Sequence, residues 1–485
     1  MNLIRFFLII VFVLTTLPLA GCELDNEQNQ DPATPPDGPK AEVWLTRGDR
    51  TKLLSKGSDL PIFNTKTSDW PIINVDTTFL HQTIDGYGAA LTGSSAYLMN
   101  RHLSPQARQA LINDLFDPEE GIGISFVRLT MGASDFSLSD FSYNDLPPGR
   151  TDFALENFSL SQDLYDVVPV MQEILAVSPD LKIMGSPWSP PAWMKTGGSM
   201  IGGRLRHDCY DVYARYFVRY VQEMRARGIT IHSVTPQNEP LFFTATYPCM
   251  EMQASEQLVF VRDYLGPHFA AAGLKTKIII YDHNWDITDY AISILNDPVA
   301  RNFIAGTAFH GYGGHVSAMS VVHDAHPDKE LHFTEISGGG WATDFASNLM
   351  WYMQNIFIGT ARNWSRSAMM WNLALNENHG PQNNGCRNCR GVVTIHENTG
   401  QITLNEEYYA IGHFSKFVRP GARRVGLLMP QGLTNIDAVA FINNNGGKVI
   451  IAANYSDDFK TFSVRQGERM FNYSLPGKSV ATITW

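Results

Sequence analysis

Two glutamates, each at the end of an apolar run, are the residues best placed for chemistry. Glu239 follows the run 231–236, and Glu335 ends the run 331–335. A glutamate in a loop is usually a solvated surface residue, but one that ends a buried strand is held at the rim of a sheet. Glycoside hydrolysis needs two such carboxylates. One donates a proton to the leaving oxygen, and the other attacks the anomeric carbon or activates water.

The residues next to the two glutamates favour this placement. Pro240 directly follows Glu239 and cannot donate a ladder hydrogen bond, so the preceding strand must end there. Three glycines, residues 338–340, follow Glu335 and let other groups approach closely. A carboxyl separation of about 5–5.5 Å would predict retention of anomeric configuration, and about 6.5–9.5 Å would predict inversion.

Short β-type runs alternate with helical stretches through the central chain, as in a parallel sheet with crossover helices. Residues 210–227 and 255–272 have helical periodicity and composition. Eight such units predict an α/β fold, a (β/α)8 barrel, with its chemistry at the C-terminal ends of the strands. The expected strands are 86–91, 124–130, 181–186, 231–236, 276–281, 305–310, 331–335 and 367–372.

Polar and aromatic residues end several of these runs. One carbohydrate cleft at the mouth of the barrel explains these endings together, whereas packing would need a separate reason for each. Aromatic side chains suit such a cleft because their faces stack on sugar rings. The candidates are Arg128, Asp135, Trp188, Asn238, His310, Tyr312 and Trp371.

Composition and charge narrow the class of partner. The net charge is −11 and no cluster of lysine and arginine is present, which argues against a nucleic-acid partner. Hydrophobic residues make up 44% of the chain and charged residues 18%, as in a packed globular enzyme. A neutral ligand fits this balance better than a polyanion. The residues leave the oligomeric state open.

The first residues of the chain resemble a bacterial lipoprotein signal. Arg5 precedes an apolar run that closes on Leu-Pro-Leu-Ala-Gly-Cys, and cleavage before Cys22 would leave its thiol to carry the lipid. Residues 23–40 are polar and proline-containing, and we expect them to form a disordered tether. These features predict an exported, membrane-anchored lipoprotein, periplasmic or at the cell surface. An ordinary signal peptide with an incidental cysteine is the alternative.

Four further cysteines could oxidise in an exported chain. Cys386 and Cys389 have CxxC spacing, for which we favour a loop disulfide, since one CxxC without a second pair or a histidine cluster is weak evidence for zinc. Cys209 and Cys249 could form a second disulfide, and spacing alone does not decide the connectivity. We expect no metal site and no cofactor.

Six ordered motifs resemble glycoside hydrolase family 30, the glucosylceramidase and β-1,6-glucanase family. The resemblance runs from about Asp85 onward and implies a retaining barrel fused to a β-sandwich. The motifs are Asp-Gly-Tyr-Gly-Ala-Ala-Leu-Thr at 85–92, Arg128 with Gly-Ala-Ser-Asp-Phe-Ser at 132–137, Ser-Pro-Trp-Ser-Pro-Pro-Ala-Trp-Met-Lys at 186–195, Thr-Pro-Gln-Asn-Glu-Pro at 235–240, Phe-Thr-Glu at 333–335 and Trp-Asn-Leu-Ala-Leu at 371–375.

The resemblance implies a division of the chain. Residues 1–22 are the signal peptide and lipobox, 23–40 the tether, and 81–420 the catalytic barrel. Residues 421–485, with a plausible hairpin around 443–447, form the sandwich, and 41–80 add strands to it. A separate carbohydrate-binding module is the alternative, disfavoured because no flexible linker divides the two parts.

The resemblance also implies roles for the site residues. Glu239 would be the acid/base, kept protonated, and Glu335 the ionised nucleophile, with Asn238 holding the sugar 2-hydroxyl. Arg128 would orient the nucleophile, unless it forms a structural ion pair without contact to Glu335. The remaining candidates would bind substrate: Asp135 and Trp188 the glucose hydroxyls, Tyr312 a position near the nucleophile, Trp371 the floor of the subsite, and His310 a neighbouring part of the cleft.

Departures from the family pattern bear on the substrate. Human-type glucosylceramidases place a tryptophan where this chain has Gly311, and segment 376–393 looks more like the β-1,6-glucanase branch. We therefore predict cleavage of a poly- or oligomeric β-1,6-glucan, by endo or exo action. The alternatives are a glucosylceramidase-like enzyme, an exo-β-glucosidase, a xylanase-like relative, or a non-catalytic glycan-binding surface lipoprotein.

Overall fold

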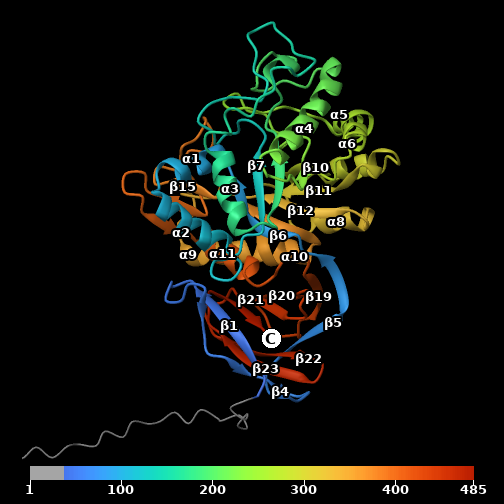
Figure 1. The fold of residues 1–485 in the computed structure, drawn as a ribbon. Helices are drawn as coiled ribbons and strands as arrows, with labels where there is room; N and C mark the ends of the chain where they lie inside the picture. The colour runs from blue at the N-terminus through green and yellow to red at the C-terminus, as the bar shows by residue number, and fades with distance from the viewer. Residues whose placement is uncertain (1–37) are drawn as a thin grey trace, which may run out of the picture. The chain divides into compact units, whose positions relative to one another are not determined.

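A closed barrel of parallel strands dominates the computed structural model, which describes residues 38–485 (Figure 1). The strands follow chain order around the barrel, and all eight predicted strands are present. The predicted signal peptide, Cys22 and most of the tether lie outside the described residues. The barrel strands are β6 (Gly86–Leu91), β7 (Phe126–Thr130), β8 (Lys182–Ser186), β9 (Ser233–Val234), β10 (Lys277–Asn284), β11 (Ile304–His310), β12 (Glu330–Glu335) and β14 (Ser365–Met370).

Helices follow the barrel strands and cover the outside of the barrel (Figure 1). Thr92 and Ser104 cap the first two helices with their side chains, each accepting a hydrogen bond from a backbone N–H of the first turn. The helices are α1 (Gly93–Arg101), α2 (Pro105–Phe116), α3 (Val167–Val177), α4 (Tyr210–Arg225), α5 (Ala254–Phe260), α6 (Gly266–Ala271), α7 (Thr288–Leu295), α8 (Ala318–Ala325), α9 (Phe345–Trp351), α10 (Ile358–Arg362) and α11 (Glu406–Ser415).

Shorter helical pieces complete the helical layer. The predicted helix 255–272 is present, but a π-helical segment, η3 (Val261–Leu265), joins α5 to α6 in its middle. A second π-helical segment, η5 (Tyr352–Phe357), joins α9 to α10. The remaining pieces are the 3-10 turns η1 (Ala192–Met194), η2 (His207–Cys209) and η4 (Ala300–Asn302).

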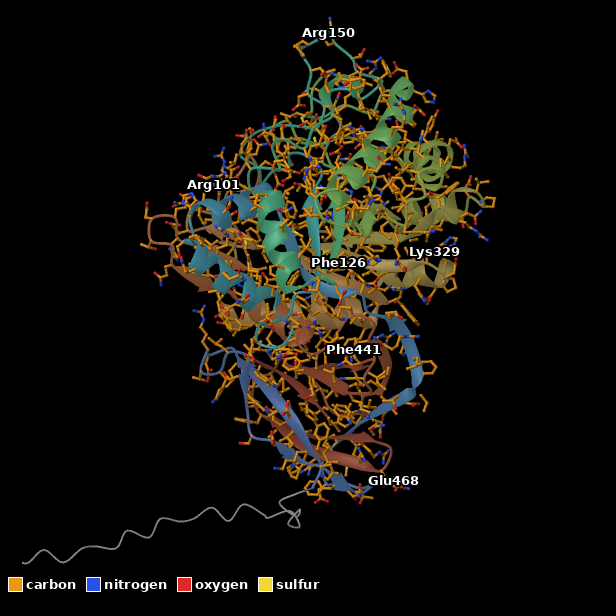
Figure 2. The ribbon with its side chains drawn as sticks, in the orientation of Figure 1. Arg101, Phe126, Arg150, Lys329, Phe441 and Glu468 are labelled. Atoms are coloured by element: carbon orange, nitrogen blue, oxygen red, sulfur yellow. A yellow bond between two sulfur atoms is a disulfide. The ribbon has the colours of Figure 1, made fainter. Side chains whose placement is uncertain are left out.

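The interior of the barrel is packed with side chains at its base. Phe126 of β7 lies at the centre of a small apolar cluster to which four other barrel strands contribute (Figure 2). This packing leaves the opposite end, where the strands terminate, as the place for polar groups. The other members of the cluster are Met184, Ile279, Ala308 and Met369.

An eleven-stranded, mainly antiparallel sheet forms the second part of the fold. Its halves share one apolar core that includes Val43, Ile73, Phe462 and Ile483, so the sheet closes on itself as a sandwich. The predicted hairpin is present, with Ile442 opposite Lys448. The strands are β1 (Lys40–Arg47), β2 (Ser55–Lys56), β3 (Leu60–Pro61), β4 (Phe63–Asn64), β5 (Ile72–Thr83), β19 (Arg423–Leu428), β20 (Ile436–Ile442), β21 (Lys448–Asn454), β22 (Lys460–Gln466), β23 (Arg469–Leu475) and β24 (Ser479–Thr484).

Barrel and sandwich belong to one compact unit, Pro39–Trp485. His413 of α11 is fully buried between them, with Nδ1 2.9 Å from Thr482 Oγ1 and Nε2 2.8 Å from Thr46 Oγ1. Phe414 packs on Phe441 of β20, which Figure 2 labels. Within residues 38–485, no helix combines the length and the apolar character needed to cross a bilayer.

Two small sheets lie in the loops after the barrel strands. β13 (Gly338–Gly339) pairs with β16 (Cys389–Arg390), and β15 (Ala374–Asn376) pairs with β17 (Val393–Ile395), which in turn pairs with β18 (Ile402–Leu404). The first of these sheets starts three residues after Glu335, and it matters for the site described next.

Candidate active site

Glu239 and Glu335 meet at the mouth of the barrel, as their positions after β9 and at the end of β12 predict. One oxygen of each carboxylate and one ring nitrogen of His310 lie within 4.8 Å of one another. Oxygens this close favour the carboxyl separation of about 5–5.5 Å found in retaining glycosidases over the about 6.5–9.5 Å of inverting ones. Glu239 has φ +43°, a left-handed conformation held by a 2.9 Å hydrogen bond from its N–H to the Asp282 carbonyl.

Arg128 is fully buried beneath the two glutamates. Its Nη1 donates to Glu335 Oε2 at 2.5 Å, and its Nη2 donates to Asn238 Oδ1 and to Asp282 Oδ2, both at 2.7 Å. The guanidinium therefore contacts Glu335 directly, which rules out the alternative of an ion pair remote from it. The planar guanidinium donates to Glu335 from one nitrogen and to Asn238 and Asp282 from another, whereas all the donors of a lysine lie on a single nitrogen.

Asp282 was not among the predicted site residues, although it is the most connected carboxylate of the site. Burial alone would raise its pKa, but the charges of Arg128 and His310 hold the pKa far below its usual range. The predicted strand stops at Tyr281, whereas β10 continues to Asn284 through a bulge at Tyr281 and Asp282. The polar run 282–284 after an apolar strand was the available signal. Asp282 accepts hydrogen bonds from Arg128, Ser186, Thr235 and Thr334, and His310 Nε2 lies 3.0 Å from its Oδ1.

His310 lies between two carboxylates rather than on the surface of the cleft. Its Nδ1 is 2.9 Å from Glu239 Oε1, its Nε2 is 3.0 Å from Asp282 Oδ1, and the side chain is fully buried. Both ring nitrogens therefore have a partner within the protein, one on Glu239 and one on Asp282. Burial alone would lower the pKa of His310, but the charges of Glu335 and Asp282 and its two hydrogen bonds raise it to about 9. At neutral pH the ring is an imidazolium that donates to both partners.

The surroundings shift the pKa values of the two glutamates in opposite directions. Burial would raise the pKa of Glu239, but the hydrogen bond and charge of His310 lower it below its usual value. Burial and the charges of Glu239 and Asp282 raise the pKa of Glu335, against the opposing effect of His310 and Arg128. The donor responsible for the lowered pKa of Glu239 is His310 Nδ1, which lies 2.9 Å from Glu239 Oε1. Groups this close titrate as a unit.

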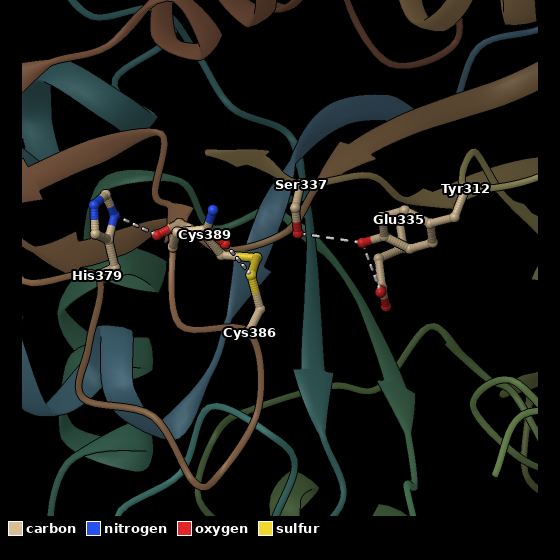
Figure 3. Close-up of a disulfide and its surroundings, with 7 residues drawn as sticks. Tyr312, Glu335, Ser337, His379, Cys386 and Cys389 are labelled. Carbon is tan, nitrogen blue, oxygen red and sulfur yellow. Dashed lines mark hydrogen bonds between the residues drawn. A yellow bond between two sulfur atoms is a disulfide. The ribbon is translucent and has the colours of Figure 1, made fainter. Parts of the chain in front are cut away.

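Both oxygens of Glu335 have a donor. Tyr312 Oη donates to Glu335 Oε1 at 3.0 Å and lies 3.2 Å from Ser337 Oγ (Figure 3). Arg128 holds the other oxygen. Two donors on opposite oxygens fix the plane of the carboxylate, which is 7% exposed. Such a group can attack along one direction only.

Aromatic rings and one free acceptor line the remaining site. Trp188 and Trp371 stack with centroids 4.9 Å apart, and the Arg128 guanidinium lies over both rings. Asp135 is buried, and its Oδ1 has no hydrogen-bond partner among residues 38–485. Burial and the charges of Glu335 and Glu239 raise the pKa of Asp135 well above its usual range. A buried acceptor without a partner suits a ligand hydroxyl.

The four cysteines among residues 38–485 form one disulfide and two free thiols. Cys386 and Cys389 form a disulfide, as favoured from the sequence. Cys209 and Cys249 are buried free thiols, so the second pair considered above is not formed. Their sulfurs are held locally instead: Cys249 Sγ accepts from the backbone N–H of Gly202 and donates to the Thr244 carbonyl.

A second acidic group, Asp85, Glu330 and His332, lies at the other end of the barrel strands. Its carboxylates are neutralised by cations: Asp85 pairs with Lys182 and Arg366, and Glu330 pairs with Lys277 and Arg366. The charge balance of this group is therefore complete without an ion.

Two opposed carboxylates at the mouth of a barrel, one fixed by Arg128 and a tyrosine, define a glycoside hydrolase. Residues 84–418 match the glycosyl hydrolase family 30 TIM-barrel domain, and residues 421–483 match the family 30 beta sandwich domain. The chain belongs to glycosyl hydrolase family 30.

Relatives with assigned names fall in two groups. The chain is 33% identical over 446 residues to the endo-1,6-beta-D-glucanase neg1 of Aspergillus fumigatus, covering 86% of this chain and 88% of that protein. It is 27% identical over 491 residues to the lysosomal acid glucosylceramidase of Mus musculus, covering 96% and 92%. Among solved structures, the endo-beta1,6-glucanase BT3312 is 35% identical with a TM-score of 0.86, covering 92% of this chain and 99% of that chain.

Proposed function

We propose that this protein is a retaining β-1,6-glucanase in which Glu335 is the nucleophile and Glu239 the acid/base. The observation that carries the proposal is the approach of the two carboxylates within 4.8 Å, with Glu335 fixed through both oxygens. The names of the relatives and of the similar solved structure support the 1,6 linkage. A binding-only lipoprotein would have no use for this arrangement.

In the first step, Glu335 attacks the anomeric carbon and the glycosidic C–O bond breaks. Glu239 delivers a proton to the departing oxygen, which leaves as a sugar hydroxyl, and the glucosyl residue stays bound to a Glu335 oxygen. The proton comes from His310, because its Nδ1 faces Glu239 Oε1 at 2.9 Å and its pKa of about 9 keeps it protonated at neutral pH. Loss of that proton to Glu239 becomes favourable as the leaving oxygen gains negative charge.

In the second step, Glu239 accepts a proton from water, which attacks the anomeric carbon and releases Glu335. Glu239 then returns this proton to His310 Nδ1, which restores the starting protonation of the pair. Two inversions at the same carbon give net retention. The transition states carry positive charge on the sugar ring, which the ionised Glu335 stabilises. The side-chain amide of Asn238 is oriented by Arg128, which binds its oxygen and leaves the NH2 to donate to the 2-hydroxyl.

Activity on defined substrates tests the proposal. We expect reducing sugar from linear β-1,6-glucan, much less from β-1,3- and β-1,4-glucans, xylan and glucosylceramide, and a loss of at least a thousandfold in Glu335→Gln. Proton NMR of the first product should show the β-anomer. An initial α-anomer would overturn retention. Equal inertness of wild type and Glu335→Gln, with both still binding the polymer, would establish a glycan-binding lipoprotein instead.

We also propose that Cys22 carries a lipid that anchors the protein at a membrane. The support is the small-residue motif before Cys22 and the polar segment after it. Metabolic labelling with a radioactive fatty acid in a bacterial host should mark the wild type and not Cys22→Ser. Equal absence of label, with the chain exported into the soluble fraction, would establish an ordinary signal peptide.

A further inference from the structure

The loop between β15 and β17 carries the Cys386–Cys389 disulfide against the candidate site. Here residues 385–390 are called the disulfide turn. Figure 3 shows the disulfide beside Ser337, with Tyr312 and Glu335 beyond it. Neither catalysis as derived above nor the stability of the barrel requires a bond here. A bond between residues three apart closes a small ring, which restricts the unfolded chain less than a long loop would.

The disulfide turn touches Asp135 through its backbone. A Cβ added at Gly385 would lie 2.5 Å from the Asp135 Cβ and 3.0 Å from its Oδ2, so only glycine permits this approach. Asn383, just before the turn, donates its N–H to the Asp135 carbonyl at 2.7 Å, and its amide donates to the Ser134 carbonyl at 3.2 Å. The turn and Asn383 therefore set the position of Asp135, whose Oδ1 has no hydrogen-bond partner among residues 38–485.

The two sulfurs pack on the aromatic wall of the site. Cys389 is buried in one apolar cluster with Trp188, Trp371 and Phe136, and Cys386 packs against that cluster. This cluster is separate from the main core of the barrel. The stacked tryptophans are thus supported by the disulfide on one side and by Arg128 on the other.

The far end of the turn is tied to the chain that follows the nucleophile. Cys389–Arg390 pairs with Gly338–Gly339, and Gly340 donates its N–H to the Asn388 carbonyl at 2.8 Å. Arg390 is anchored in turn, because its Nη2 donates to Glu406 and Glu407 of α11, both at 2.6 Å. One short covalent ring therefore joins the Asp135 segment, the tryptophan pair and the Glu335 loop.

We propose that the disulfide turn is a positioning element of the glycone subsite, which holds Asp135 and the Trp188–Trp371 pair where they bind the glucosyl residue. The inference rests on the proposed glycosidase roles and adds to them a part of the chain that touches no reacting atom. The disulfide turn should affect binding of the glucose unit rather than proton transfer, because it contacts neither Glu239 nor His310 among the interactions described.

Removal of the disulfide is the first test. In Cys386→Ser/Cys389→Ser we expect KM to rise roughly tenfold or more, since a small misplacement of a binding group costs up to about a hundredfold. The same factor should appear for β-1,6-glucan and for p-nitrophenyl β-glucoside, because both place a glucose in this subsite. The pH profile of kcat should stay unchanged. Dithiothreitol should reproduce the KM rise in the wild type and have no effect on the double variant.

A second variant tests the contact with Asp135 and does not depend on the disulfide. Gly385→Ala introduces a methyl group against Asp135, and Gly197→Ala is the matched control because a Cβ there meets nothing within 4 Å. We expect a raised KM in the first and a wild-type KM in the second. In an Asp135→Asn background, Gly385→Ala should add less than about twofold, since the two changes act through one group.

Calorimetric binding of a glucose-shaped iminosugar, 1-deoxynojirimycin, separates this inference from the proposed function, because binding needs no turnover. We expect weaker binding in the double variant and in Gly385→Ala. If the wild type cleaves no β-glucoside but these shifts appear, the glycanase assignment fails and the positioning role stands. Wild-type affinity and KM in a double variant shown to lack the bond, or in Gly385→Ala, would overturn the positioning role.

Discussion

Replacing Asp282 with asparagine removes a buried negative charge and leaves the shape of the side chain almost unchanged. Asp282 faces the Arg128 guanidinium at 2.7 Å and His310 Nε2 at 3.0 Å, and it is fully buried. Removing one partner of such a pair costs about 3–5 kcal/mol of folding free energy, because the remaining charges are left without compensation. We therefore expect Asp282→Asn to fold with a clearly lower free energy of unfolding.

The same substitution changes the protonation of His310. Its rise from 6.5 to about 9 corresponds to roughly 3 kcal/mol of net stabilisation of the imidazolium, at about 1.4 kcal/mol per pKa unit. Asp282 is one of the two charges that cause this rise, so the pKa of His310 should fall to its ordinary range or below. In the wild type, this stabilisation is present below pH 6.5 and is lost as pH rises through about 9. In Asp282→Asn, that loss should move to lower pH.

NMR titration of labelled histidine, with kcat/KM measured against pH, provides the assay. We expect the alkaline limb of the wild-type profile near pH 9, and a variant whose activity at pH 8 is at least tenfold below its own activity at pH 6. Asp286→Asn, which changes an exposed carboxylate just after β10, is the matched control. The reasoning is refuted if His310 still titrates near 9 in Asp282→Asn, or if Asp286→Asn moves it equally.

Three further predictions concern single contacts. Tyr312→Phe removes the 3.0 Å hydrogen bond to Glu335, worth about 1.5–3 kcal/mol, and should lower kcat roughly tenfold to a hundredfold; an unchanged kcat would contradict it. Arg128→Lys replaces donors on two nitrogens with donors on one, so the contacts to Glu335, Asp282 and Asn238 should not all be kept. Both kcat and the thermal midpoint should fall, and a wild-type kcat would contradict this expectation. Burial lowers the pKa of His413 to about 3, so below pH 6.5 the unfolded chain binds a proton that the folded chain does not. The free energy of unfolding, measured by denaturant titration, should therefore fall by about 1.4 kcal/mol per pH unit below pH 6.5. His413→Gln should lose this slope while His315→Gln, an exposed control, keeps it.

The barrel strands were predictable because each is an apolar run bounded by helical or turn residues. β9 is shorter than predicted, because only Ser233–Val234 of the expected strand 231–236 pairs with the neighbouring strands. Pro236 has no N–H to donate, so the ladder cannot continue past Thr235, whose own N–H bonds the Gly185 carbonyl at 3.0 Å. The apolar run followed by polar residues still placed Glu239 at the barrel mouth, although the strand itself is short.

The electrostatics of the site could not be predicted in the same way. Asp282 lies on a bulge that moves it into the site, and a bulge has no signature in an apolar run. The protonation of Glu239 depends on His310, whose pKa depends on carboxylates from two other strands. Such coupling requires the distances across the barrel, so the roles expected for Glu239 and His310 could be assigned only in part.

The pairing of β1 with β24 has a consequence for how the chain folds. Glu42 lies opposite Thr484, so this ladder joins residues more than 400 positions apart, and the whole barrel is inserted between its two strands. Contacts of such sequence separation form late, because a long loop must close before they stabilise anything. During synthesis the barrel strands are available first, and the edge of β1 stays unpaired until β24 emerges. We therefore expect refolding in two phases, with glycosidase activity recovering before the sandwich is protected from hydrogen exchange.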